Sequence, residues 1–185
     1  MKKYCFFIAL FFIACCLMPD GVKAQAKSLK LVFIRHGERP ENGDNLNCQG
    51  LNRSMQLPGV LYKKFGKPGN IYVPSLKLNE ATKRARMFQT ITPFAAKYNL
   101  NINSEYAEED YKHFGKALLK ESGTIIIVWE HNNIVPVLSY LGVKTGSLKW
   151  ADTDFDSMWI VTFPKGSAVL TKDKEGLKPS PNCPF

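Results

Sequence analysis

Residues 29–38 spell Leu-Lys-Leu-Val-Phe-Ile-Arg-His-Gly-Glu, and their apolar first part decides how the chain folds. The run over 29–34 is short, apolar and partly β-branched, which predicts a buried strand that ends just before the Arg-His pair. A second run, Thr-Ile-Ile-Ile-Val-Trp over 124–129, is the strongest strand prediction in the chain. The two most apolar strands therefore deliver one histidine each, His36 and His131, to their carboxyl ends.

Strands alternate with helices along the rest of the sequence. This order predicts an α/β fold, a single three-layer domain with a mainly parallel central sheet and helices on both faces. A chain of 185 residues has room for one such domain. Ligands of these folds bind beyond the carboxyl ends of the strands, where both histidines are expected. The expected helices are 47–64, 79–98 with a kink or break at Pro93, 108–120 and 134–140; the further strands are 71–73, 157–163 and 167–171, with a turn over 164–166.

The first residues have the pattern of a secretory signal peptide. A positive start precedes an almost unbroken apolar run over 4–18, and Val-Lys-Ala at 22–24 is a small-residue cleavage pattern. We therefore expect a signal peptide over 1–24 and a mature domain over 25–185, in a periplasmic or extracellular bacterial protein with no stable membrane anchor after cleavage. One alternative is an uncleaved anchor, for which the apolar run is short of the roughly 20 residues that span a bilayer. The other is a lipoprotein acylated at Cys15.

The cysteine content and the net charge indicate the redox compartment and the class of binding partner. Removal of the leader leaves Cys48 and Cys183. A pair of cysteines in an oxidising compartment predicts one disulfide between the tail and an early loop, with two unpaired thiols as the alternative. The formal charge of +9 suits anionic partners. Because no basic run carries interleaved aromatic residues, we expect a small anionic substrate and no nucleic acid.

Four motifs resemble those of one enzyme superfamily. Arg-His-Gly-Glu at 35–38 follows the first strand, Leu-Asn-Cys-Gln-Gly-Leu-Asn-Arg at 46–53 opens the first helix, Arg86 precedes Gln-Thr at 89–90 in the second helix, and His131 follows the late strand. In this order, and in this helix and strand context, they resemble the histidine phosphatase superfamily, which includes the cofactor-dependent phosphoglycerate mutases. The resemblance implies a phosphoglycerate-mutase-like fold and phosphoryl transfer through a histidine.

The resemblance also implies a role for each of these residues. His36 would be the nucleophile that forms a phosphohistidine, while Arg35, Arg86 and His131 would bind the phosphoryl group. Arginine suits this role because its planar fork of donors stays cationic and matches phosphoryl oxygens. We expect no cofactor and no metal, since the sequence lacks the ligand clusters typical of zinc or iron sites.

Two arginines, Arg84 and Arg86, lie in the same predicted helix. Residues two apart at 3.6 per turn point about 200° apart, so the two side chains cannot both face one pocket. The spacing to the Gln-Thr motif selects Arg86 and leaves Arg84 as a surface charge. In the loop after the nucleophile, Arg39 is expected to extend the cationic rim and Asn45 to donate to phosphate.

A leaving alkoxide needs a proton, which the family usually takes from a carboxylic acid between the second arginine and the late histidine. The family spacing Glu-x-x-Phe/Tyr-Gly, matched to Phe-Gly at 114–115, puts Tyr111 at the position of this acid. Glu109 is therefore our choice for the acid, with Asp110 and Glu130 as alternatives.

Taken together, these features predict an exported, metal-independent phosphatase that hydrolyses phosphate monoesters or phosphohistidine. A phosphoglycerate-mutase-like phosphotransferase is the first alternative. It is disfavoured because the mature chain is short and because export removes the protein from glycolysis. The second alternative is a phospho-ligand binding module without turnover, since the acid is not at its usual position.

Overall fold

The computed structural model describes residues 28–76 and 84–183, so the predicted signal peptide over 1–24 lies outside the described part of the chain. The described residues form six strands and four α-helices. The strands are β1 Lys30–Arg35, β2 Asn70–Tyr72, β3 Ile102–Asn103, β4 Thr124–Trp129, β5 Ser157–Thr162 and β6 Val169–Lys174. The helices are α1 Cys48–Phe65, α2 Ala85–Tyr98, α3 Tyr111–Leu118 and α4 His131–Tyr140.

All six strands join one sheet in the order β3-β2-β4-β1-β5-β6. β1 is parallel to β4, and β2 is parallel to β3 and β4, whereas β5 and β6 run antiparallel to their neighbours. The register of the two central strands sets Arg35 beside Trp129. Both strands therefore end at the same edge of the sheet, and the predicted α/β fold with a mainly parallel sheet is confirmed.

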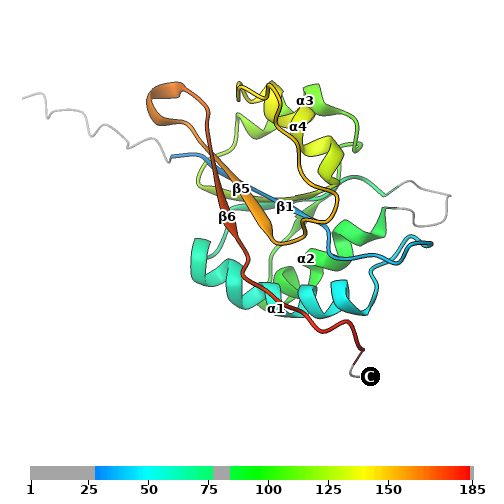
Figure 1. Cartoon of the computed structure of the whole chain (residues 1–185). Helices are drawn as coiled ribbons and strands as arrows, with labels where there is room; N and C mark the ends of the chain where they lie inside the picture. The colour runs from blue at the N-terminus through cyan, green and yellow to red at the C-terminus, as the bar shows by residue number, and fades with distance from the viewer. Residues whose placement is uncertain (1–27, 77–83, 184–185) are drawn as a thin grey trace, which may run out of the picture.

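Helices cover both faces of this sheet and make it the middle of three layers (Figure 1). Side chains of β1 alternate between the faces: Leu31 and Phe33 pack in the core on the side of α3 and α4, and Val32 and Ile34 pack on the side of α1 and α2. All four are fully buried. A strand covered on both faces needs a continuous apolar run, which is why this segment lacks the polar alternation of a surface strand.

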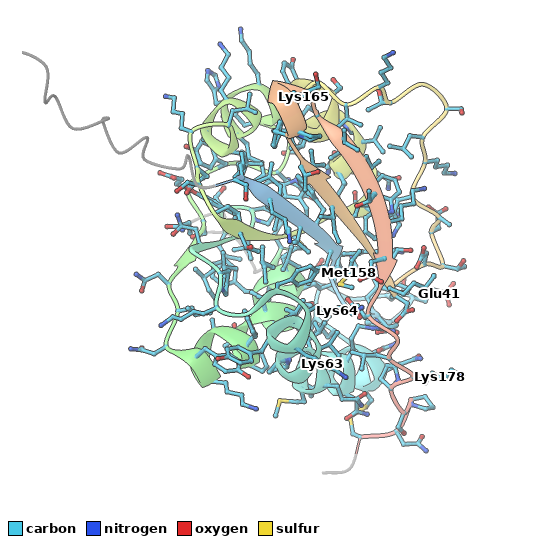
Figure 2. The ribbon with its side chains drawn as sticks, turned by 90° about the vertical axis from the view of Figure 1, so that its left-hand side faces the viewer. Glu41, Lys63, Lys64, Met158, Lys165 and Lys178 are labelled. Atoms are coloured by element: carbon cyan, nitrogen blue, oxygen red, sulfur yellow. A yellow bond between two sulfur atoms is a disulfide. The ribbon has the colours of Figure 1, made fainter. Side chains whose placement is uncertain are left out.

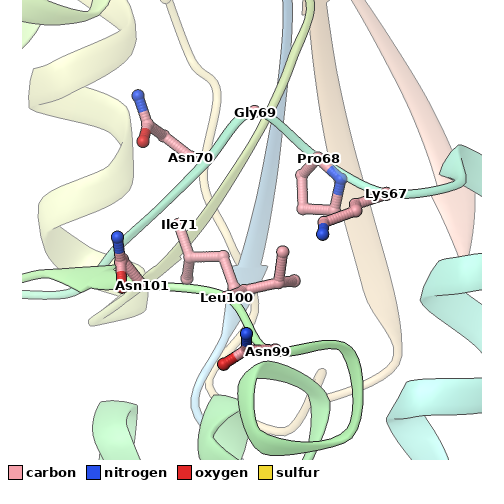
Figure 3. Close-up of a pocket in the computed structure, with 8 residues that line it drawn as sticks. All are labelled: Lys67, Pro68, Gly69, Asn70, Ile71, Asn99, Leu100 and Asn101. Carbon is pink, nitrogen blue, oxygen red and sulfur yellow. The ribbon is translucent and has the colours of Figure 1, made fainter.

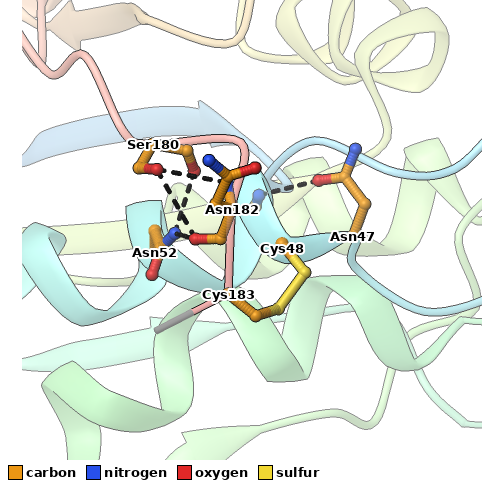
Figure 4. Close-up of a disulfide and its surroundings, with 7 residues drawn as sticks. Asn47, Cys48, Asn52, Ser180, Asn182 and Cys183 are labelled. Atoms are coloured by element: carbon orange, nitrogen blue, oxygen red, sulfur yellow. Dashed lines mark hydrogen bonds between the residues drawn. A yellow bond between two sulfur atoms is a disulfide. The ribbon is translucent and has the colours of Figure 1, made fainter. Parts of the chain in front are cut away.

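A disulfide fixes the C-terminal segment against the start of α1 (Figure 4). It joins Cys48 to Cys183, which lie 135 residues apart in the sequence, with a Cα–Cα distance of 5.0 Å. Nearby, the side-chain amide of Asn52 donates to the backbone carbonyls of Ser180 and Asn182, each at 2.8 Å. The pair of cysteines expected to link the tail to an early loop is thus joined. A cross-link across so long a loop restricts the unfolded chain strongly.

Three helices differ from their predicted form, each for a local reason. α2 runs unbroken through Pro93, because its apolar face is buried in the core beside α1. The predicted start of this helix lies partly outside the described residues. Asp110 caps α3, which begins at Tyr111, later than predicted. Glu130 caps α4, which begins at His131, earlier than predicted.

The edges of the sheet also differ from the prediction. β3 has only two residues, too few for a periodic pattern, and was not expected. β6 begins at Val169 because Pro164–Gly166 forms a 3-10 turn, and Figure 2 shows Lys165 of this turn at the end of the hairpin away from Lys178. Within the described residues, no helix is long and apolar enough to cross a membrane.

Candidate active site

His36 follows β1 and is almost completely buried, with 1% of its surface exposed. Its Nδ1 lies 2.7 Å from the backbone carbonyl oxygen of Gly37. Since a carbonyl only accepts, Nδ1 carries the hydrogen, and the lone pair of the neutral ring is on Nε2. The pKa of His36 is lowered to about 4, mainly by burial and further by the charges of Arg86 and Arg35. The hydrogen bond to Gly37 acts in the opposite direction and raises this pKa. The ring is therefore neutral, with a free lone pair on Nε2, at any pH well above 4.

Two helices hold the backbone that follows this histidine. From α2, the hydroxyl of Thr90 accepts a hydrogen bond from the N–H of Gly37 at 2.8 Å. From α1, Gly50 lies against the backbone of Glu38 so closely that a Cβ at position 50 would lie 2.2 Å from the Glu38 carbonyl oxygen. Only glycine fits this contact, which explains the glycine in the motif that opens α1.

Arg35 and Arg86 bring two guanidinium groups towards His36. Burial lowers the pKa of Arg35 to about 10 and also lowers the pKa of Arg86, so both remain cationic at neutral pH. In both side chains the Nε atom is buried and has no hydrogen-bond partner among the described residues. An unpaired buried donor costs free energy, and an anion that accepts its hydrogen bond removes that cost. The pair therefore offers unpaired cationic donors near His36 that an anion could accept from.

The loop between α4 and β5 fixes the Arg35 side chain. The guanidinium carbon of Arg35 lies 3.9 Å from the ring centroid of Phe155. Its Nη1 donates to the backbone carbonyl of Asp152. The Phe155 ring also lies 6.2 Å, centroid to centroid, from the ring of His36. Nothing in the sequence motifs singled out this loop, which nevertheless touches the first arginine and faces the nucleophile.

His131 opens α4 between two carboxylates. Its Nε2 lies 2.9 Å from Oδ1 of Asp152. Its Nδ1 lies 2.5 Å from Oε1 of Glu130, in a direction that is poor for a hydrogen bond. Because a carboxylate oxygen accepts, Nε2 of His131 carries a hydrogen and donates it to Asp152. Burial raises the pKa of Glu130, but His131 and the N–H of Asn132 outweigh burial and hold that pKa below its usual value.

The acids proposed from the sequence lie in different surroundings. Glu109, our choice, is mostly exposed and pairs with Arg84 at 2.8 Å. Its neighbour Glu108 is buried and also pairs with Arg84 at 2.8 Å; burial raises the pKa of Glu108 although Arg84 lowers it. Asp110 caps α3. The prediction that Arg84 is a solvated surface charge is wrong, because its side chain is only 19% exposed and pairs with the buried Glu108. Position 84 precedes α2, which begins at Ala85, so the helical angle does not direct this side chain away from the site.

The two residues expected to extend the substrate surface, Asn45 and Arg39, lie in the loop between β1 and α1. The side-chain oxygen of Asn45 accepts from the amide of Gln89 at 2.7 Å, which ties this loop to α2. Arg39 is exposed, and its Nη1 donates to the carbonyls of Pro40 and Glu41 at 3.3 and 3.4 Å. Contact of either side chain with phosphate stays a prediction.

A buried ion-pair network holds the loop that follows His36, between β1 and α1. Arg53 of α1 lies 2.7 Å from Glu38, in that loop, and 2.5 Å from Glu175, just after β6. The side chains of Arg53 and Glu175 are 4% and 0% exposed. Burial raises the pKa of Glu175 to about 8, although the charge of Arg53 lowers it. Arg53 therefore links three parts of the chain: the loop that follows His36, α1 and the C-terminal segment.

Two of the cavities in the described part of the chain lie at different edges of the sheet. One of about 600 Å³ adjoins the candidate site and is lined by Glu38, Gln49, Arg53, Asp152, Thr153, Asp154, Phe155, Asp156 and Lys174. The other, of about 210 Å³, lies where β2 and β3 begin (Figure 3) and is lined by Lys67, Pro68, Gly69, Asn70, Ile71, Asn99, Leu100 and Asn101. Only the first shares residues with the contacts of Arg35 and His131.

Comparison with solved structures identifies the fold. The protein histidine phosphatase SixA in complex with tungstate is 14% identical, with a TM-score of 0.60 over 79% of this chain and 97% of that chain. The chain has the histidine phosphatase fold. The mycobacterial glucosyl-3-phosphoglycerate phosphatase bound to inorganic phosphate is 13% identical, with a TM-score of 0.55 over 78% of this chain and 95% of that chain.

A mutase shares this histidine phosphatase fold with the phosphatases. The phosphoglycerate mutase from Bacillus anthracis is 11% identical to this chain, with a TM-score of 0.54 over 80% of this chain and 93% of that chain. No family model and no curated protein matches the sequence. The likeness therefore lies in the fold, and the activity has to be argued from the side chains.

Proposed function

We propose that this protein is a phosphatase that hydrolyses phosphate monoesters, or phosphohistidine, through a phosphohistidine intermediate on His36. The observation that carries the proposal is the pairing of a buried, neutral His36, whose Nε2 holds the lone pair, with Arg35 and Arg86, whose buried Nε donors are unpaired. A nucleophile next to an anion site is what phosphoryl transfer requires.

The reaction follows in two displacements. Nε2 of His36 attacks phosphorus, the ester P–O bond breaks, and the departing oxygen takes up a proton. Arg35, Arg86 and His131 balance the negative charge that spreads over the phosphoryl oxygens. Water then attacks the phosphohistidine, the P–N bond breaks, and the electron pair returns to Nε2 as inorganic phosphate leaves. In this scheme the two arginines and His131 neutralise charge without a metal.

Electrostatics favour hydrolysis over the mutase alternative. Glu130 and Asp152 contact His131, and Glu108 is buried nearby, close enough for its charge to act on Arg86. A phosphoglycerate carries a carboxylate in addition to its phosphate, and carboxylates of the protein at this distance repel it. A substrate with a neutral or cationic leaving group avoids that repulsion.

Export to the periplasm or the cell exterior is part of the proposal. The leader pattern over 1–24 motivates it, and the disulfide between Cys48 and Cys183 supports it, because disulfides persist in oxidising compartments. Signal-peptide cleavage after Ala24 would be checked by N-terminal sequencing of the protein recovered from a bacterial host.

The test is hydrolysis of para-nitrophenyl phosphate from pH 4 to 8 in the presence of EDTA, for the wild-type protein and His36→Ala. We expect EDTA-resistant turnover that the substitution abolishes, and a phosphoenzyme that survives alkali but not acid, as an N–P bond does. Phosphate binding without turnover in the wild type would instead support a binding module. Turnover that EDTA removes, or that survives His36→Ala, would refute the mechanism.

A further inference from the structure

Asp152 contacts the candidate site from a loop that carries none of the phosphatase motifs. Its Oδ1 lies 2.9 Å from Nε2 of His131, and its backbone carbonyl accepts from Nη1 of Arg35. Phe155, three residues further along, stacks on the same guanidinium group. In the proposed function, His131 and Arg35 both hold the phosphoryl group. Asp152 therefore occupies donors that a phosphoryl group would use.

The other carboxylates near the site are held by structural partners. Glu108 is fixed by Arg84 and by the side chain of Asn133, at 2.8 and 3.1 Å. Glu109 is paired with Arg84, as described above, and Asp110 caps a helix.

Glu130 likewise accepts from the N–H of Asn132 and caps α4. Asp152 differs from Glu130, which also contacts His131, because the Asp152 side chain is 70% exposed and caps none of the described helices. A short rotation of this side chain would free the histidine without disturbing a cap or a buried ion pair.

We propose that the phosphoryl group of the substrate replaces the Asp152 side chain as the hydrogen-bond acceptor of His131, and that Asp152 then donates a proton to the leaving oxygen. This inference rests on the proposed function. As the bond from His36 Nε2 to phosphorus forms, the ester P–O bond breaks and its electron pair takes the proton of the Asp152 carboxyl group. In the second displacement the Asp152 carboxylate accepts a proton from the attacking water, and the P–N bond breaks.

The pKa of Asp152 changes when His131 donates to the phosphoryl group and no longer to Asp152. In the free protein, the hydrogen bond from His131 is the main cause that holds the pKa of Asp152 below its usual value, and the charges of Lys149 and Arg35 add to it. A phosphoryl group that takes the His131 donor removes the main cause and places negative charge beside the carboxylate. Both changes raise the pKa of Asp152 and favour the protonated form that donation requires.

The experiment compares Asp152→Asn with the wild type on two substrates, para-nitrophenyl phosphate and an alkyl phosphate such as glycerol phosphate. Nitrophenolate departs without help, whereas an alkoxide needs a proton. We expect the single-turnover rate of phosphoenzyme formation from the alkyl phosphate to fall by about 10²-fold or more, and that from the nitrophenyl ester to fall by less than about tenfold. The inhibition constant of inorganic phosphate should fall, because the competing carboxylate is gone.

Two further variants separate chemistry from structure. Asp152→Glu should restore part of the turnover of the alkyl phosphate. Asp173→Asn removes an exposed carboxylate on β6 that pairs with Lys64 of α1, and it should leave both substrates unaffected.

The outcomes are distinguishable from those that test the function itself. An equal loss on both substrates with weaker binding of phosphate would show a structural role for Asp152 and overturn the inference. Unchanged turnover of the alkyl phosphate would overturn it as well, while the proposed function stood. Absence of any His36-dependent turnover in the wild type would refute the proposed function, and the proton-donor role with it.

Discussion

The ends of β1 and β4 each present a histidine, and the two histidines are treated in opposite ways. His36 bonds to a backbone carbonyl, lies beside two arginines and has a pKa lowered to about 4. His131 lies between the carboxylates of Glu130 and Asp152. The first environment leaves a lone pair on Nε2 of the neutral ring, and the second places a hydrogen on Nε2 for donation. Equal positions in a parallel sheet thus suit a nucleophile at one strand and a charge-stabilising donor at the other.

The largest expected effect separates these two roles. His36→Ala should lower kcat on the order of 10⁴-fold or more and leave no phosphoenzyme, because it removes the attacking atom. His131→Ala should lower kcat by roughly 10²- to 10³-fold, the usual cost of one transition-state donor, and still form a phosphoenzyme slowly. Rapid-quench labelling with radioactive substrate would measure both. Equal losses, or a phosphoenzyme in the first variant, would contradict the division of labour.

The buried ion pairs of Arg53 support the segment that follows β1, and a substitution of Arg53 tests that support. Arg53→Met removes the partner of Glu38 and of the fully buried Glu175, and the loss of one partner of a buried ion pair costs about 3–5 kcal/mol above about pH 8, where Glu175 is charged. Urea denaturation should show that loss in the free energy of unfolding. Lys64→Met, which removes an exposed ion pair with Asp173, is the matched control and should cost no more than about 1 kcal/mol. A similar cost for both variants would mean that the network does not hold the β1 end.

The lowered pKa of His36 also makes stability depend on pH. Between about pH 6.5 and 4 the unfolded chain carries a proton on this residue and the folded protein does not, so stability falls as pH falls through that range. The expected loss is about 3 kcal/mol, complete near pH 4. His36→Asn, whose amide can still donate to the Gly37 carbonyl, should lack this part of the loss. Parallel stability curves for the two proteins from pH 7 to 4 would show that His36 titrates normally when folded.

Sequence reasoning recovered the β1 end better than the β4 end. The strand over 124–129 was predicted with its observed bounds, because a strand buried on both faces leaves a continuous apolar run. The motifs around His36 could be found because each is a short stretch of sequence, although distant residues such as Thr90 hold them in place. Asp152 and Phe155 could not, since they reach the site through the path of a loop that no periodicity encodes. The exposed surroundings of Glu109 and the burial of Glu108 likewise depend on tertiary packing.

The smallest expected effect tests whether the two ends act on each other at a distance. The charge of Glu130 raises the pKa of His36, against burial, which is the main cause of its lowering. Glu130→Gln keeps an oxygen to cap α4 and removes that charge, so the pKa of His36 should fall below about 4, by less than about one unit. Titration of the three histidines by NMR would measure the shift.

Glu121→Gln is the matched control for this substitution. Glu121 accepts hydrogen bonds from Tyr72 and Asn70, before β4 begins, and it is not among the charges that act on His36. Its substitution should therefore leave the midpoint of His36 unchanged. If Glu130→Gln also leaves that midpoint unchanged, the neutrality of the nucleophile is set at the β1 end alone. A shift seen only with Glu130→Gln would mean that Glu130, which contacts His131, also raises the pKa of His36.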